Sequence, residues 1–307
     1  MSAGGGATAI IAALLANAGI AVAKFVGYLV TGSSSMLAEA AHSVADTANE
    51  GLLLIGRRSA RRAATDQHPF GYGRDRYFYS FVVALLLFSL GAVFALYEGA
   101  HKLYSHETIS SPLVGMGILL VATVLESLSL RTAITESRPL KGDGSWWRFI
   151  KRSTSPELPV VLLEDAGALL GLLLAFGGVA LSVLTGNPVW DALGTLGIGV
   201  LLGAIAIILI VETKSLLIGE GANPDELRAI CTAMVGRGVD RVIHLKTQYL
   251  GPDELLVAAK IAVPATLSTA EVARVIDETE ARIRGAVPAA RIIYLEPDLD
   301  RTPASTS

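Results

Sequence analysis

The sequence predicts an α-helical membrane protein, made of a bundle of six transmembrane helices and a small α+β domain at the C-terminal end. Its composition is the first reason: of 307 residues, 52% are hydrophobic and only 17% are charged, whereas soluble globular domains average about 25% charged residues. The second reason is a series of apolar runs that approach the roughly 20 residues needed to cross a bilayer. The third is a change of composition after residue 211, where no further long apolar run follows.

Composition also excludes several classes of function. A formal net charge of −3 leaves no basic excess to neutralise phosphates, so nucleic-acid binding is excluded as a main role. The single cysteine, Cys231, excludes a disulfide framework or a cysteine-based zinc site within one chain. The N-terminal run Met-Ser-Ala-Gly-Gly-Gly carries no basic residue, so we expect no cleaved signal peptide.

Six segments are predicted to span the membrane, although the second and fifth carry acidic residues that lower their hydropathy. The loops after the second and fourth segments hold six Lys or Arg each, whereas the loops on the opposite side hold only Lys102. By the positive-inside rule both termini are expected in the cytoplasm, and we expect the protein in the cell (plasma) membrane. The segments are 7–30, 36–55, 79–97, 113–130, 158–183 and 189–211.

Residues 1–212 are therefore expected to form a transmembrane domain, residues 213–300 a cytoplasmic domain and residues 301–307 a polar tail. In the cytoplasmic part the pattern predicts a helix, two strands joined by a hairpin turn, a second helix and a last strand. Ser268 and Glu271 have the spacing of a capping box at the start of the second helix. So small a sheet favours helices on one face only. The predicted elements are 224–236, 240–250, 255–263, a helix after 268, and 291–296.

Ionisable side chains inside the predicted spans are the candidate functional residues, because each costs about 2.5–3.5 kcal/mol near the bilayer centre. His42 and Asp46 in the second span are four residues apart, so they lie on one face of the helix and can reach a single divalent ion. Asp165 in the fifth span is the natural counterpart on a second helix. An imidazole with carboxylates suits Zn²⁺, and Mn²⁺ or Fe²⁺ where carboxylates dominate.

These residues also have other interpretations, which the pattern leaves open. His42 and Asp46 could form a hydrogen-bonded pair that only holds helices together. Glu164 precedes Asp165 and points about 100° away from it around the helix, so it could be a further ligand or could face the lipid headgroups.

A second pair of candidate metal ligands, Asp66 and His68, lies in the arginine-rich loop after the second span. One carboxylate and one imidazole bind a metal weakly, so this pair is a secondary candidate. The alternative, which we favour, is a rigid Gly-Pro turn that places Phe70 and Tyr72 at the membrane interface, where aromatic residues concentrate.

The run SSSMLAEAAHSVADTANEGLLLIG, followed by HPFGYGR, resembles the signature of the cation diffusion facilitator transporters. The predicted spans, the arginine-rich loop and the soluble tail follow the family's order over nearly the whole chain. The resemblance implies a homodimer that exports divalent transition-metal cations from the cytoplasm in exchange for protons, with Zn²⁺ favoured and Mn²⁺, Fe²⁺ and Co²⁺ as alternatives. It also implies a ferredoxin-like C-terminal domain that helps to dimerise the subunits, and a transport site that includes His42, Asp46 and Asp165.

The sequence departs from the family pattern at the fourth ligand. Members with a full site place a His or Asp four residues before the aspartate of the fifth span, and that position is Val161 here. The chain instead has the pair Glu164-Asp165, which resembles a distinct branch of the family. Asp66 and His68 match part of a loop site found in some members.

Two other classes of function could use the same residues. A membrane-embedded metalloenzyme would activate a metal-bound water, but the sequence has no HExxH-type motif; we therefore expect no enzyme, and the metal as transported substrate and not as a cofactor. A proton-coupled exporter of organic cations would need a wide, aromatic-lined cavity. The second and fifth spans are instead rich in small residues, which favour close helix packing.

Overall fold

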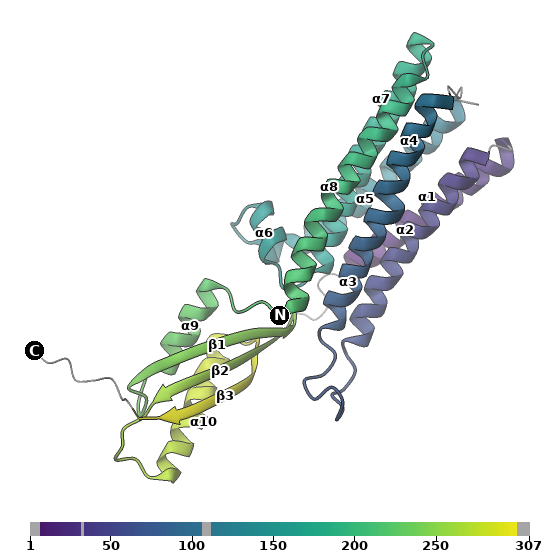
Figure 1. The fold of residues 1–307 in the computed structure, drawn as a ribbon. Coiled ribbons are helices and arrows are strands. Elements are labelled where there is room, and N and C mark those ends of the chain that lie inside the picture. Colours follow the sequence, from purple (N-terminus) through teal and green to yellow (C-terminus); the bar gives the residue numbers. More distant parts are fainter. Residues whose placement is uncertain (1–6, 32–33, 106–111, 300–307) are drawn as a thin grey trace, which may run out of the picture. The chain divides into compact units, whose positions relative to one another are not determined.

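The computed structural model describes residues 7–31, 34–105 and 112–299, and it separates the chain into two compact units (Figure 1). We call the first, Met1–Arg62 with Asp75–Lys214, the helical unit. We call the second, Ala63–Arg74 with Ser215–Ser307, the sheet unit. The arginine-rich loop thus groups with the C-terminal part of the chain, which sequence analysis had not predicted.

The helical unit contains long helices that run alongside one another (Figure 1). The third of them passes without a break from α3 through a π-helical stretch, η1, into α4, where wider turns replace the regular α-helical turns. The elements are α1 (Ala7–Thr31), α2 (Ser34–Ser59), α3 (Asp75–Leu86), η1 (Leu87–Val93), α4 (Phe94–Ser105), α5 (Pro112–Lys141), α6 (Trp146–Arg152), α7 (Glu157–Thr185) and α8 (Val189–Ile218).

Five helical segments in the described ranges are long and apolar enough to cross a membrane, and they match five of the predicted spans. The predicted second span forms α2, a helix of 26 residues, which is long enough for a bilayer at about 1.5 Å rise per residue. Its acidic and basic side chains lower its hydropathy, but α2 packs against α1 and α3 as a member of the bundle. The five segments are Ala7–Leu29, Asp75–Tyr104, Gly115–Lys141, Glu157–Thr185 and Val189–Ile218.

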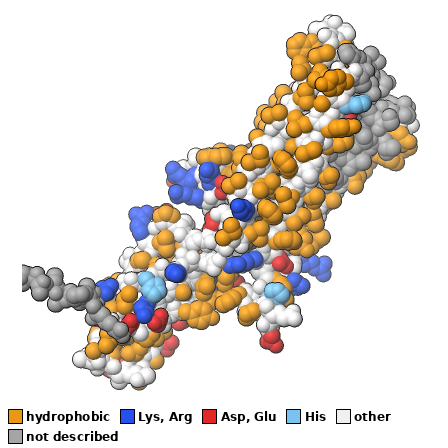
Figure 2. Space-filling model, in the orientation of Figure 1, with side chains coloured by type: hydrophobic (Ala, Val, Ile, Leu, Met, Phe, Trp, Pro, Cys, Tyr) orange, Lys and Arg blue, Asp and Glu red, His pale blue; other side chains and the backbone are white. Residues whose placement is uncertain are grey.

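The helical unit is apolar on the outside as well as in its core. Ile10, Leu53 and Leu209 lie in the buried core, while Leu173 and Val200 are 66% and 64% exposed. Figure 2 shows hydrophobic side chains over much of the visible face of the helices. Such a surface is expected when lipid surrounds a protein, and exposed apolar patches of this extent are rare on soluble monomers.

The sheet unit holds a three-stranded sheet in the order β1-β2-β3, formed by β1 (Arg241–Gly251), β2 (Glu254–Ala262) and β3 (Ala290–Asp298). β1 and β2 are antiparallel, whereas β2 and β3 are parallel, because α10 (Thr269–Ala286) supplies the crossover that parallel strands require. α10 packs on β3 and on α9 (Pro224–Met234), and α9 also packs on β1. The predicted α+β order is therefore confirmed.

Both helices of the sheet unit begin with a capping box. The predicted box is present at α10, where the Ser268 hydroxyl accepts a hydrogen bond from the Glu271 backbone N–H and the Glu271 carboxylate accepts one from Ser268. A second box at α9, formed by Asn223 and Glu226, was not predicted. Each box satisfies backbone N–H groups that have no partner within the helix.

The short helix α6 was missed by sequence analysis, because its seven residues are too few to show a periodic pattern. Ser145 caps it by accepting a hydrogen bond from the Arg148 backbone N–H at 3.2 Å. Phe149 and Ile150 are buried, whereas Trp147 remains about half exposed. The helix is therefore stabilised both by the Ser145 cap and by the burial of Phe149 and Ile150.

The arginine-rich loop lies against the turn between β1 and β2. A Cβ atom added to Gly73 would lie 2.7 Å from the Leu250 carbonyl oxygen and 3.1 Å from Gly251 Cα. Only glycine allows the two backbones to approach this closely. The loop is thus tied to the sheet unit by direct backbone packing.

Candidate functional site

Asp165 lies near the start of α7 and is 2% exposed. Its Oδ2 atom accepts a hydrogen bond from the Ser129 hydroxyl of α5 at 2.7 Å. Val161, one turn earlier, is fully buried in the apolar core, so no ligand replaces the missing fourth residue at that position.

On α2, Asp46 is half-buried and lies within electrostatic range of Glu126 and Glu164. The side chain of His42, one turn earlier on the same helix, lies outside the described residues. Within the described ranges, no three His, Cys, Asp or Glu side chains are placed so that they could hold a metal ion. The site formed by His42, Asp46 and Asp165 therefore stays a prediction.

The structure brings more acidic residues together than sequence analysis had assigned to the site. Glu50 is fully buried, Glu126 is 5% exposed and Glu164 is 8% exposed, and their carboxyl groups interact with one another and with Asp46 and Asp165. We call these five residues the acidic cluster. Its members come from α2, α5 and α7, so three helices surround one strongly acidic region inside the bundle.

Glu50 was not assigned a role from the sequence, although a signal was present. It follows His42 and Asp46 at the same four-residue spacing, which continues their helical face by one more turn. Glu164 is buried inside the helical unit, so it does not face the headgroup region.

The start of α7 is held by a buried ion pair. The Arg76 guanidinium of α3 bonds both oxygens of Glu157: Nη2 lies 2.9 Å from Oε2, and Nε contacts Oε1. The Arg76 side chain is 10% exposed and that of Glu157 is 1% exposed. This pair connects α3 to α7 close to Glu164 and Asp165, so it helps to fix the end of the helix that carries them.

Asp66 and His68 are both exposed. The loop closes through backbone hydrogen bonds from His68 N–H to the Thr65 carbonyl at 3.0 Å and from Thr65 N–H to the His68 carbonyl at 3.2 Å. The His68 ring lies 4.6 Å from the Tyr72 ring, centroid to centroid. In the part of the loop that the structure describes, no third ligand joins Asp66 and His68. The contacts build a closed turn.

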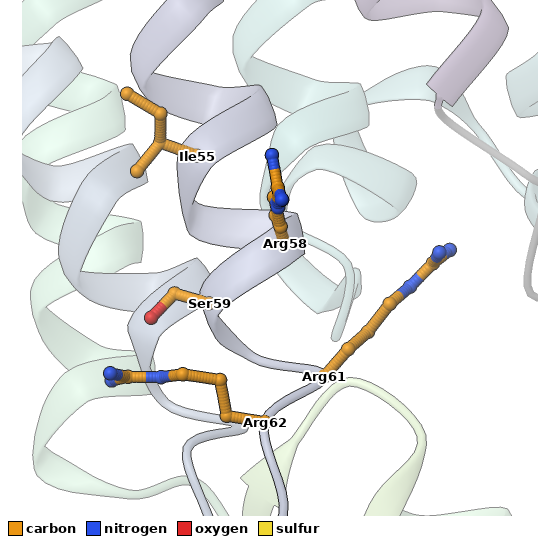
Figure 3. A pocket seen from close by; sticks show the side chains of 5 residues that line it. All are labelled: Ile55, Arg58, Ser59, Arg61 and Arg62. Carbon is orange, nitrogen blue, oxygen red and sulfur yellow. The ribbon is translucent and has the colours of Figure 1, made fainter.

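At the end of α2 an open hollow of about 330 Å³ is lined by basic side chains (Figure 3). Arg62 is paired with Asp75 at 3.4 Å, and Ser59 donates a hydrogen bond to the same carboxylate. The hollow is positively charged and so does not attract metal cations. Its lining residues are Ile55, Arg58, Ser59, Arg61 and Arg62.

Two protein-family models match this chain. The family model described as the cation efflux transmembrane domain matches residues 10–218, and the model described as the cation efflux protein cytoplasmic domain matches residues 220–298. The chain belongs to the cation efflux family, also called the cation diffusion facilitators, whose members are integral membrane transporters and not enzymes. The resemblance noted in the sequence is thereby confirmed.

Several characterised proteins are similar to this chain. It is 36% identical over 241 residues to the mitochondrial proton-coupled zinc antiporter SLC30A9 of Xenopus laevis, an alignment that covers 78% of this chain and 43% of that protein. It is 32% identical over 262 residues to metal tolerance protein C4 of Arabidopsis thaliana, in an alignment that covers 82% of this chain and 56% of that protein. It is 25% identical over 285 residues to the magnetosome protein MamB of a Magnetospira strain, in an alignment that covers 92% of each chain. The chain thus spans less than half of the SLC30A9 relative.

Proposed function

We propose that this protein is a secondary active transporter that exports a divalent transition-metal cation, Zn²⁺ in the first place, from the cytoplasm in exchange for protons. The observation that carries the proposal is the acidic cluster, buried inside the helices of a cation efflux transmembrane domain. The name of the SLC30A9 relatives, proton-coupled zinc antiporter, supports Zn²⁺ and protons. Mn²⁺, Fe²⁺ and Co²⁺ are the alternative substrates.

The transported ion binds His42 and Asp46 of α2 and Asp165 of α7, and Glu164, the other candidate ligand, is not one of these three. Ser129 orients the Asp165 carboxylate through the hydrogen bond to Oδ2, and Oδ1 is the atom that we propose faces the ion. These ligands must lose protons before they bind a metal. Protons that arrive from the other side of the membrane therefore compete for the same atoms and release the ion, and an imidazole such as His42 exchanges protons near physiological pH when unperturbed.

The proposed organisation assigns transport to residues 1–212 and dimerisation to residues 213–300. The match to the cation efflux cytoplasmic domain supports a homodimer. The excess of Lys and Arg in two loops supports both termini in the cytoplasm, and we propose the cell membrane as the location. Asp66 and His68 are assigned to the closed turn and not to the transport site.

A transporter of large organic cations is disfavoured by the packing of α7. A Cβ atom at Gly167 would lie 2.5 Å from Ile205 Cδ1 of α8, so these helices are in close contact where such a substrate would need room. Small residues at helix contacts allow this approach.

The test is metal-resolved uptake into proteoliposomes under an imposed pH gradient, with Zn²⁺, Mn²⁺, Fe²⁺ and Co²⁺ measured separately. Asp46→Asn and Asp165→Asn should each abolish transport while the protein remains inserted. Asp143→Asn, the same change at an exposed loop position, is the control and should transport normally. Normal flux in either cluster variant would refute the site, and flux without proton counter-movement would refute the exchange.

A further inference from the structure

Two buried carboxylates of the acidic cluster have no cation beside them among the described residues. Glu50 is fully buried, and neither of its carboxylate oxygens has a hydrogen-bond partner in the described part of the chain. Glu164 is 8% exposed, and the Asn49 side chain is the neutral group beside its carboxylate. Native proteins leave few buried polar groups without a partner, and each exception calls for an explanation. An unpaired carboxylate in an apolar interior is strongly unfavourable unless a cation or a proton neutralises it.

Other buried acids of the same bundle do have compensating groups. Glu157, 1% exposed, is paired with Arg76, and Glu126 is attracted by Lys24. Asp165 accepts a hydrogen bond from Ser129. Glu50 therefore differs from these neighbours. Glu164 is its first charged neighbour, and the first charged neighbour of Glu164 is Asp46 on α2.

Both residues are displaced toward the same end of the bundle. Ser59 at the end of α2 donates a hydrogen bond to Asp75 at the start of α3, and Arg76 beside it pairs with Glu157 at the start of α7. The end of α2 and the start of α7 thus lie at one end. Relative to the transport site, Glu50 lies one turn beyond Asp46 toward this end, and Glu164 lies one residue beyond Asp165.

We propose that Glu50 and Glu164 form a second binding position for the transported divalent cation, between the transport site and the arginine-bearing end of the bundle. This inference rests on the proposed function. The two carboxylates supply two negative charges, which match one divalent ion. Glu50 has Glu164 as its strongest charged neighbour, and the buried Asn49 side chain lies beside Glu164 and adds an amide oxygen.

The chemistry of this position differs from that of the transport site. All of its ligands are oxygen atoms, which suit Mn²⁺ and other hard divalent ions, whereas the transport site adds the imidazole of His42. Zn²⁺, the substrate proposed in the first place, prefers a site that includes an imidazole, so it is released more readily from a position that offers only oxygen ligands. The pair therefore passes the ion between the transport site and the solution at that end.

The experiment is calorimetric titration of Mn²⁺ and Zn²⁺ into the full chain in lipid nanodiscs at one fixed pH. Glu50→Gln and Glu164→Gln should each bind one ion fewer per chain than the unmodified protein. The double variant should also bind one ion fewer per chain, as each single variant does, since both carboxylates hold the same ion. Glu98→Gln, the same change at a half-buried position of α4, should bind as the unmodified protein does.

Failure of this inference can be told apart from failure of the proposed transport site. Asp165→Asn should abolish flux but retain the ion held by Glu50 and Glu164. Unchanged stoichiometry in Glu50→Gln would overturn the inference, whatever Asp165→Asn does. Without metal, Glu50→Gln should be at least as stable to heat as the unmodified protein, because an unpartnered carboxylate is removed; a lower stability would show a structural role and would also overturn it.

Discussion

The buried ion pair between Arg76 and Glu157 offers a quantitative test of how the bundle holds α7. Both side chains are nearly inaccessible, at 10% and 1% exposure, and two N–H···O contacts join them. An exposed pair would contribute only about 0–1 kcal/mol. Removing one partner of a buried pair costs about 3–5 kcal/mol, because the other charge stays buried without this partner. We therefore expect Glu157→Leu to destabilise the protein by about 3–5 kcal/mol.

The measurement is unfolding in mixed micelles titrated with a denaturing detergent, followed by circular dichroism. Arg76→Met and Glu157→Leu are compared with the double variant, because such a cycle isolates the interaction of the two side chains. The double variant should be closer in stability to the unmodified protein than Glu157→Leu is, since no uncompensated charge remains. A loss below about 1 kcal/mol in both single variants, or additive losses in the double variant, would refute the buried-pair argument.

Three further predictions concern the sheet unit. Ser268→Ala removes the side-chain oxygen that caps α10 and should destabilise the start of this helix by about 1 kcal/mol. The measurement is amide hydrogen exchange at the start of α10, which should become faster; an unchanged exchange rate would contradict this prediction. Hydrogen bonds from the backbone and hydroxyl of Ser268 lower the pKa of Glu271 below its ordinary 4.5. The ionised Glu271 carboxylate therefore stabilises the start of α10 fully above pH 4.5, and this stabilisation is lost as the pH falls through the lowered pKa of Glu271. Exchange in α10 should then accelerate in acid for the unmodified protein and less so for Glu271→Gln. Gly73→Ala would place a methyl group 2.7 Å from the Leu250 carbonyl oxygen and should speed proteolysis of the loop 63–74, and an unchanged rate would show that the loop is not held there.

The elements with a long or regular pattern could be predicted from the sequence. The apolar runs that became α1, α7 and α8 were predicted to within a few residues, except that α8 continues to Ile218. The strands and the capping box at Ser268 were also predicted correctly. These features depend on neighbours in the chain: hydropathy over about 20 residues, alternation with period two, and side chains three residues apart.

Features that depend on residues far apart in the chain required the tertiary structure. The sequence determined that His42, Asp46 and Asp165 were the residues to consider, through their types and spacing within single helices. Only the structure shows that Glu50 is buried without a hydrogen-bond partner in the described part of the bundle, with Glu164 of another helix as its first charged neighbour, and that Gly73 packs against the turn after β1. The physical reason is that the burial of a charged side chain, and the groups beside it, depend on which helices pack together. The spacing of residues along one helix does not show which helix packs against it.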